Sequence, residues 1–421
     1  MRLSLNQQIF IGAFLGISGG IFLGGLPQGS SFYAGTLYVC EIVGGIFINL
    51  LKMIVIPLVF TSIASGMANL RTHTQIGRIW STTLVYFLST SALASLLGLI
   101  VVNIFKPGVG LSTSLFEGAM ENFSTQHLTF ADFLKSFLLS LFVNPVAAMA
   151  KGEVMATVVF AFFVGAGLIA LGERTQKLHS LLNETFEIIM VIVGWVMRIA
   201  PWGVMALLTK LLATQDLSLL SSLAKFIFVV LGSTLFHGLV VLPLILYLLT
   251  GKSPFFLLNG IKEALITALS TSSSSATLPV TLRCVQDHLK VDKRIAGFVL
   301  PLGATINMDG TALYEAMAAL FVANIVGADL NWVQQVVVLF MAVVASVGAP
   351  GIPSAGMVTM VMVLQAVGLP VEAIAILLPM DRLLDTFRTA VNVEGDCVGS
   401  LVVGHFHTDS GRFRPNSRST F

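Results

Sequence analysis

The sequence contains very little charge. Only 10% of its 421 residues are Asp, Glu, Lys or Arg, whereas a soluble domain is about one quarter charged. Hydrophobic residues make up 56% of the chain, and its mean hydropathy is +0.91. This composition excludes an ordinary soluble domain and predicts an all-α polytopic membrane protein. The formal net charge of +2 gives no support for nucleic-acid binding.

Cysteine is also scarce. Cys40, Cys284 and Cys397 lie in or beside apolar segments without CxxC spacing, so we expect buried thiols, not disulfides or a metal centre. A membrane enzyme is disfavoured, because the sequence has no nucleophile–base pair and no HExxH motif. The N-terminal segment has a single Arg2 and no small-residue cleavage pattern, which predicts a retained helix.

Long apolar runs fill the first 250 residues, each about 20 residues or more, the length that spans a bilayer. They predict helices at 8–26, 37–68, 78–105, 153–171, 182–212 and 221–250. The second run is interrupted by Pro57 and is long enough to tilt. Residues 106–135 predict an outer loop, and residues 135–151 predict short helical pieces.

Basic residues fall in alternate loops, which sets the orientation of the chain. Together with the N-terminal arginine they are Arg2, Arg71, Arg78, Arg174, Lys177 and Lys252. Loops rich in Lys and Arg remain in the cytoplasm. We therefore expect a multi-pass protein of the plasma (inner) membrane with both termini in the cytoplasm.

Beyond residue 250 the apolar segments are broken at their middles. Residues 254–290 are interrupted by TSSSSATLP, residues 295–325 by NMDG, and residues 331–366 by SVGAPGIPSAG. The pattern predicts eight transmembrane helices plus two oppositely inserted re-entrant helical hairpins. Such broken helices are typical of alternating-access transporters, and we expect the two hairpin tips to face each other across a binding site. A channel using the same polar path is the alternative.

The helix predicted over Asp381–Asp396 has a polar stripe within an apolar region. At about 100° per residue its members project within roughly 60° of one direction, and Glu394 points the opposite way. The stripe consists of Asp381, Asp385, Arg388, Thr389, Asn392 and Asp396. A stripe of this kind cannot face lipid, so it is predicted to line a site.

Five ionisable residues lie at predicted membrane depth: Asp309, Glu315, Asp385, Arg388 and Asp396. At about 2.5–3.5 kcal/mol each, leaving all of them unpaired would cost on the order of 15 kcal/mol. That cost exceeds a typical folding stability, so they must have partners. The carboxylates outnumber the arginine, which leaves room for hard cations such as sodium. An internal salt-bridge network is the alternative.

The polar residues together describe an acidic amino acid. Arg388 matches a carboxylate, Asp385 suits an ammonium group, and Ser274 with Asn392 suits a second carboxylate. A direct Asp385–Arg388 ion pair without a ligand role is the alternative. A C4-dicarboxylate symporter is disfavoured, because a dicarboxylate substrate has no ammonium group to compensate the charge of Asp385. Glu315 is a candidate proton carrier or, equally, a structural hydrogen-bonding residue.

Four motifs in this order resemble the dicarboxylate/amino acid:cation symporter family, the glutamate transporters. They are TSSSSATLP, GATINMDGTALYEA, GIPSAGMVTM and DTFRTAVNVEGD. The similarity is dense over residues 254–404 and looser before them. The resemblance implies a symporter that imports L-glutamate or L-aspartate with sodium and that works as a homotrimer by an elevator-like motion. No other cofactor is implied.

The resemblance also implies a division of the chain. Residues 1–76 and 134–215 would form a scaffold with helices 1–2 and 4–5. Residues 77–133 and 216–404 would form the moving transport part, with the third helix, the sixth helix, both hairpins and the last two spans. Residues 405–421 are expected to be a flexible cytoplasmic tail.

Residue by residue, the resemblance implies the ligands. The substrate would contact Ser272, Ser274, Thr311, Ile352, Gly356, Asp385, Arg388, Thr389 and Asn392. Three sodium sites would use Gly303, Asn307, Asn392 and Asp396; Thr305, Ser346, Val347 and Ala349; and Thr90, Ser91, Asn307 and Asp309. Neutral-amino-acid relatives usually lack the arginine, so Arg388 favours acidic substrates over a neutral amino acid carrier. Proton-carrying relatives have a glutamate where Glu315 stands. Phe87 and Pro350 depart from the family pattern.

Overall fold

The computed structural model describes residues 5–27, 30–69, 77–110, 135, 138–214, 218–349, 351 and 355–408, and over these ranges it contains helices and no strand. Five helical stretches are long and apolar enough to cross a membrane: Gln7–Gly24, Ser31–Leu50, Ile79–Phe105, Ala156–Thr214 and Ser221–Thr250. The prediction of an all-α polytopic membrane protein is confirmed at this level. Most of the predicted outer loop and of the tail lies outside the described residues.

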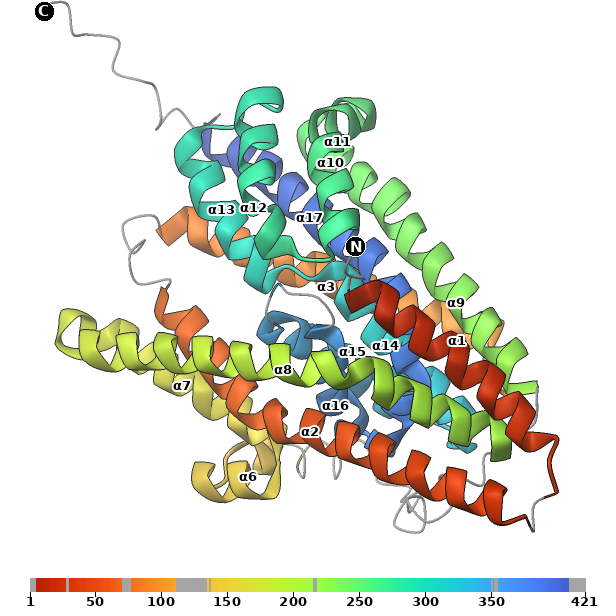
Figure 1. Ribbon diagram of the computed structural model, residues 1–421. Helices are drawn as coiled ribbons and strands as arrows, with labels where there is room; N and C mark the ends of the chain where they lie inside the picture. The colour runs from red at the N-terminus through yellow and green to blue at the C-terminus, as the bar shows by residue number, and fades with distance from the viewer. Residues whose placement is uncertain are drawn as a thin grey trace, which may run out of the picture.

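The N-terminal half builds a layer of long helices. It contains α1 (Leu5–Gly24), α2 (Ser31–Asn69), α7 (Val154–Leu171) and α8 (Gln176–Thr214), and a 3₁₀ turn, η3 (Gly172–Thr175), joins the last two. α8 packs against α1 and α2, and α7 packs against α2 (Figure 1). α2 and α8 have 39 residues each. At 1.5 Å per residue each is about 58 Å long, which exceeds a hydrocarbon core of about 30 Å and requires tilt.

Pro57 does not break α2, contrary to the interruption expected there. The helix continues from Ser31 to Asn69 with Pro57 inside it, and α8 likewise contains Pro201. Tolerance of this kind is usual in membrane helices, because neighbouring helices and hydroxyl side chains satisfy the freed backbone groups. One turn further along, the Thr61 hydroxyl donates a hydrogen bond of 2.7 Å to the Pro57 carbonyl, although this carbonyl is not the group that the proline frees.

The first 250 residues also contain α3 (Gly77–Phe105), α6 (Pro145–Lys151) and one uneven helix. α3 is a single long helix, and α6 accounts for the short helical piece predicted before the fourth span. The predicted helix 221–250 is continuous but uneven. It consists of α9 (Ser218–Phe236), a π-helical turn named η4 (His237–Val241) and α10 (Leu242–Thr250).

The C-terminal half is divided at the motifs that interrupt the apolar runs. α11 (Pro254–Thr271) and α12 (Ser274–Arg283) form a packed pair, followed by a π-helical turn, η5 (Cys284–His288). α13 (Lys293–Ile306) and α14 (Asp309–Val326) are separated by Asn307 and Met308. α15 (Trp332–Gly348) and α16 (Ala355–Ala366) form a second packed pair. η6 (Val371–Ala373) then leads into α17 (Ile374–Thr408).

α17 lies at the centre of the C-terminal half. It packs against α9, α10, α11, α12, α13, α14 and α16, and in Figure 1 it runs between the pairs in blue. Because protein surrounds it on several sides, its polar stripe is enclosed instead of facing lipid. All six residues of the stripe are buried, and Arg388 is among the largest fully buried side chains.

Candidate functional site

The tip of the α11–α12 pair is a short non-helical turn inside the protein. Ser272 has a left-handed backbone with φ of +50° and is buried. Ser273 caps α12, because its hydroxyl accepts a hydrogen bond of 3.1 Å from the Ala276 N–H. Ser274 begins the helix and is also buried. The tip therefore presents hydroxyls and N–H groups at a helix start, a setting that favours an anion.

The tips of the two helix pairs contact each other directly, whereas the sequence predicted that they face each other across a binding site. The Ser273 hydroxyl donates to the Gly351 carbonyl over 2.7 Å, and the Ser275 N–H donates to the same oxygen over 3.1 Å. Ala349, on the other side of Pro350, packs against Met308 in the break between α13 and α14. Two of the predicted residues, Pro350 and Ile352, lie outside the described residues.

Arg388 is the centre of a buried charge cluster. Its Nη2 donates to Asp381 over 2.8 Å and to Asp385 over 2.7 Å, and its guanidinium lies 4.1 Å from the ring centroid of Tyr314. The Asp385–Arg388 pair considered in the sequence analysis is therefore present. It uses only part of the arginine, because Nη1 and Nε have no hydrogen-bond partner among the described residues.

Other predicted substrate residues surround this arginine. A Cβ added to Gly356 would lie 3.7 Å from both Nη1 and Nη2 of Arg388 and 3.1 Å from the Thr311 methyl group. Asn392 accepts a 2.8 Å hydrogen bond from the Gly310 N–H and donates a 3.4 Å one to the Thr311 hydroxyl. Residues of α14, α16 and α17 thus converge on one place, beside the unpartnered donors.

The first predicted sodium set is also brought together. Asn307 donates a hydrogen bond of 2.9 Å to Asp396, and its own N–H donates to the Gly303 carbonyl over 2.8 Å. A Cβ on Gly303 would lie 2.3 Å from the Asp396 carboxylate, so only glycine permits this approach. The set therefore offers carboxylate, amide and carbonyl oxygens, which are the ligands of hard cations.

The set on α3 and α14 is similarly close. The Ser91 hydroxyl donates to Asp309 over 2.8 Å, and Thr90 donates to the Phe87 carbonyl over 3.1 Å and to the Asn307 oxygen over 3.5 Å. In the remaining predicted set the Ala349 N–H donates to the Ser346 carbonyl over 3.3 Å, but no hydrogen bond joins Thr305 to the other three members among the described residues. The hydroxyls of Thr305 and Ser346 each donate to a carbonyl of their own helix.

Sequence reasoning missed several partners of the predicted residues. His237 lies 3.3 Å from Asp309, Thr359 donates to Glu315, and Arg382 lies 3.8 Å from Asp385. His237 sits in an apolar run, so no local pattern marks it, whereas Thr359 belongs to the GIPSAGMVTM motif. Arg382 stands beside Asp381, shortly before the DTFRTAVNVEGD motif.

Glu394 lies off the stripe, as predicted, but it is buried like the stripe residues. A Cβ on Gly238 would lie 3.1 Å from its carboxylate, which places Glu394 against the π-helical turn η4. The cysteine prediction is confirmed, because all three cysteines are buried free thiols.

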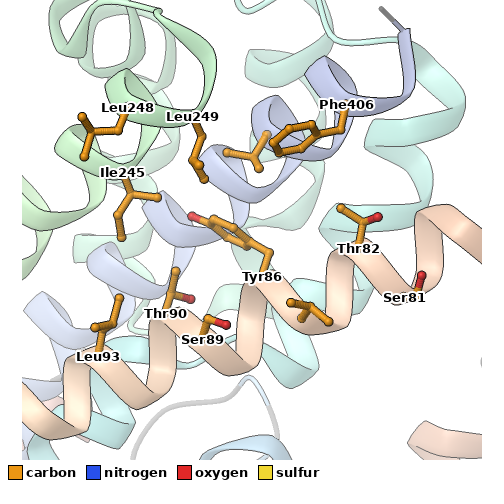
Figure 2. Close-up of a pocket in the computed structure, with 12 residues that line it drawn as sticks. Ser81, Thr82, Tyr86, Ser89, Thr90, Leu93, Ile245, Leu248, Leu249 and Phe406 are labelled. Atoms are coloured by element: carbon orange, nitrogen blue, oxygen red, sulfur yellow. The ribbon is translucent and has the colours of Figure 1, made fainter. Parts of the chain in front are cut away.

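An open cavity of about 540 Å³ lies beside Thr90, one of the predicted sodium residues, and Arg388 does not line it. It is formed by α3, α10 and α17 and is mainly apolar, and Figure 2 shows Tyr86, Ser89 and Thr90 of α3 facing Ile245 and Leu249 of α10. Thr90 therefore borders this cavity on one side and Asn307 on the other. None of the predicted substrate residues lines it.

An all-helical membrane protein with broken helices around buried carboxylates and an arginine is, by fold and site, a membrane transport protein. The chain belongs to the sodium:dicarboxylate symporter family, whose family model matches residues 5–406. This is a family of sodium-coupled transporters and not of enzymes.

Named relatives are similar over most of the chain. The chain is 36% identical to an excitatory amino acid transporter of Caenorhabditis elegans, over 86% of this chain and 80% of that protein. It is 35% identical to excitatory amino acid transporter 2 of Mus musculus, over 96% of this chain and 80% of that protein. It is 37% identical to neutral amino acid transporter B(0) of Oryctolagus cuniculus, over 86% of this chain and 73% of that protein.

Proposed function

We propose that the protein is a secondary active symporter that imports L-glutamate or L-aspartate together with sodium. The main support for this proposal is the environment of Arg388. This arginine is fully buried, and two of its nitrogen groups have no partner among the described residues, beside Thr311 and Gly356. A buried guanidinium with unused donors is costly unless an acceptor arrives, and a carboxylate matches its geometry.

Asp385 and the serine tip supply the remaining contacts of an amino acid. When Arg388 turns to the side-chain carboxylate of the substrate, Asp385 becomes available for the ammonium group. Ser274, at the start of α12, and Asn392, on α17, would hold the α-carboxylate. Backbone groups near Ser272 and Ile352 would close around the substrate, and Thr389 is buried next to Arg388.

Sodium would be held by the three residue sets named above, and the family supports sodium as the co-transported ion. Asp396 and Asp309 would supply the negative charges. Glu315 is the proposed proton carrier. It is buried, it accepts a hydrogen bond from Thr359, and its second oxygen has no partner among the described residues.

The movement we propose is elevator-like. Residues 1–76 and 134–215 would remain fixed as a scaffold, and residues 77–133 and 216–404 would carry the substrate across. The proposed topology has eight transmembrane helices and two hairpins, α11–α12 and α15–α16, inserted from opposite sides. The proposed assembly is a homotrimer in the plasma membrane, with both termini in the cytoplasm. Residues 405–408, which the sequence assigned to the tail, belong to α17, and the rest of that tail lies outside the described residues.

A neutral amino acid carrier is the second candidate, because one relative is named as a neutral amino acid transporter. For a neutral substrate, Arg388 would gain no acceptor for its unused donors. Arg388 would then stay paired with Asp381 and Asp385 in an internal ion-pair network. Competition between acidic and neutral amino acids for uptake separates the two candidates.

The test is uptake of radiolabelled aspartate and glutamate into proteoliposomes under separately imposed sodium and proton gradients. We expect accumulation against the substrate gradient when sodium is supplied outside. An additional inward proton gradient should increase it if Glu315 carries a proton. Equal uptake without any ion gradient would contradict symport, and uptake of neutral amino acids alone would favour the second candidate.

A further inference from the structure

α17 contains a second buried arginine that has no role in the proposed binding of substrate. Arg382 is only 6% exposed, and its Nη1 lies 3.8 Å from Oδ2 of Asp385. Oδ1 of the same carboxylate accepts the 2.7 Å hydrogen bond from Arg388. Asp385 therefore lies between two arginines, each facing a different oxygen.

The charges of this cluster balance only if Arg382 is counted. Asp381 and Asp385 carry two negative charges, and Arg388 and Arg382 carry two positive ones, all in residues that are at most 6% exposed. Without Arg382, this group of four residues would lose half of its positive charge in the protein interior, where unbalanced charge is expensive.

We propose that Arg382 is a positioning residue that holds Asp385 and so frees Arg388 for the anionic substrate. This inference rests on the proposed function of the site. An arginine bound by two acids is a poor partner for a third carboxylate, whereas an arginine that shares one of these acids, Asp385, with a second cation is released more easily. Arg382 thereby favours substrates with an extra negative charge over neutral amino acids.

The geometry limits what Arg382 does. A distance of 3.8 Å is an ion-pair contact and not a short bidentate hydrogen bond. Charge therefore matters more here than the planar guanidinium, and a lysine should substitute for it. This differs from Arg388, whose proposed role needs the planar guanidinium and its two parallel N–H donors.

The experiment compares Arg382→Met, Arg382→Gln and Arg382→Lys with the wild type in proteoliposomes. The measurements are the half-saturation concentration and maximal rate of aspartate uptake, and the inhibition of that uptake by alanine. Arg382→Met should raise the half-saturation concentration for aspartate about tenfold, the scale of a lost interior charge contact. The maximal rate should change less, and inhibition by alanine should become relatively stronger. Arg382→Lys should remain close to the wild type.

Arg294→Gln is the matched control, because it neutralises an arginine that pairs with Asp292 at an exposed position, and it should leave uptake unchanged. Arg382→Gln retains a polar end and serves as the neutral variant if Arg382→Met does not fold. The inference is overturned if the folded neutral variant has wild-type half-saturation for aspartate, or if lysine fails to rescue it. A wild type that transports only neutral amino acids would instead overturn the proposed function, and this inference with it.

Discussion

Arg388 shows how a single side chain can be both a structural and a binding element. Its charge is balanced by Asp381 and Asp385, and its plane covers Tyr314, so the residue is held without substrate. The donors that remain unused point to where the substrate is proposed to bind. A buried group that is only partly satisfied is unusual, and such groups cluster at functional sites.

Replacing Arg388 with cysteine should abolish uptake of aspartate and glutamate. The variant removes the proposed partner of the side-chain carboxylate and also the cation that Asp381 and Asp385 share. Uptake of neutral amino acids is the informative comparison, since they do not need the arginine. Retained transport of acidic amino acids by Arg388→Cys would contradict the role proposed for this residue.

Asp396→Asn should weaken the dependence of uptake on sodium. The substitution keeps the shape of the side chain and its contact with Asn307 but removes the negative charge from the first sodium set. The sodium concentration for half-maximal uptake should rise by about tenfold or more, as expected when a hard cation loses a carboxylate ligand. An unchanged sodium activation curve in liposomes would count against the site.

At the scale of elements, small residues determine how closely the helices approach. Gly12, Gly16 and Gly20 repeat every four residues along α1 and face α8. Spacing of this kind allows the backbones of two membrane helices to come into contact. The same close packing of α8 against α1 and α2 fixes the layer against which the C-terminal half is built.

Gly16→Ala should therefore destabilise the protein. The added Cβ would lie 2.7 Å from the Met205 carbonyl and 2.9 Å from the Leu208 Cβ, so α1 and α8 must separate. Overpacking of this kind costs about 1–3 kcal/mol, which should lower the midpoint of thermal unfolding in detergent. Gly45→Ala is the control, because nothing lies within 4 Å of its added Cβ. An equal midpoint for both variants would show that the contact is unimportant.

At the scale of the whole molecule, the proposal divides the chain into a fixed and a moving part that are in contact. A cavity of about 480 Å³ lies at this boundary, and it is lined by Phe162 of α7 and by Phe340 of α15. Leu88 of α3 and Val344 of α15 line the same cavity, but both belong to the proposed moving part. An elevator-like motion would change the distance between Phe162 and Phe340 but not the distance between Leu88 and Val344.

Cross-linking should distinguish these two pairs. A protein with cysteines at Phe162 and Phe340 should lose uptake after treatment with a flexible bifunctional thiol reagent, because the two parts can no longer slide. Cysteines at Leu88 and Val344 should cross-link without loss of uptake. The native cysteines are buried. The protein without added cysteines, treated with the same reagent, gives the background loss of uptake. Full activity of the cross-linked Phe162–Phe340 pair would exclude the proposed division.

Sequence alone was enough to predict a helical membrane protein and the breaks of its helices beyond residue 250, although the interruption expected at Pro57 was wrong. These properties depend on composition and on local patterns, since a serine-rich or NMDG break within an apolar run has few alternatives. The polar stripe of α17 was predictable for the same reason, because helix periodicity fixes which residues share a face.

Contacts between residues of different helices depend on how the helices pack, and local sequence patterns do not reveal them. Ser273 and Gly351 are 78 residues apart, and His237 and Asp309 are 72 residues apart. Periodicity gives the direction of a side chain within its own helix but not the identity of the neighbour across it. Arg382 and Asp385 are different, because they are three residues apart on α17 and helix geometry alone makes them neighbours. For this pair the packing of the surrounding helices adds only the burial.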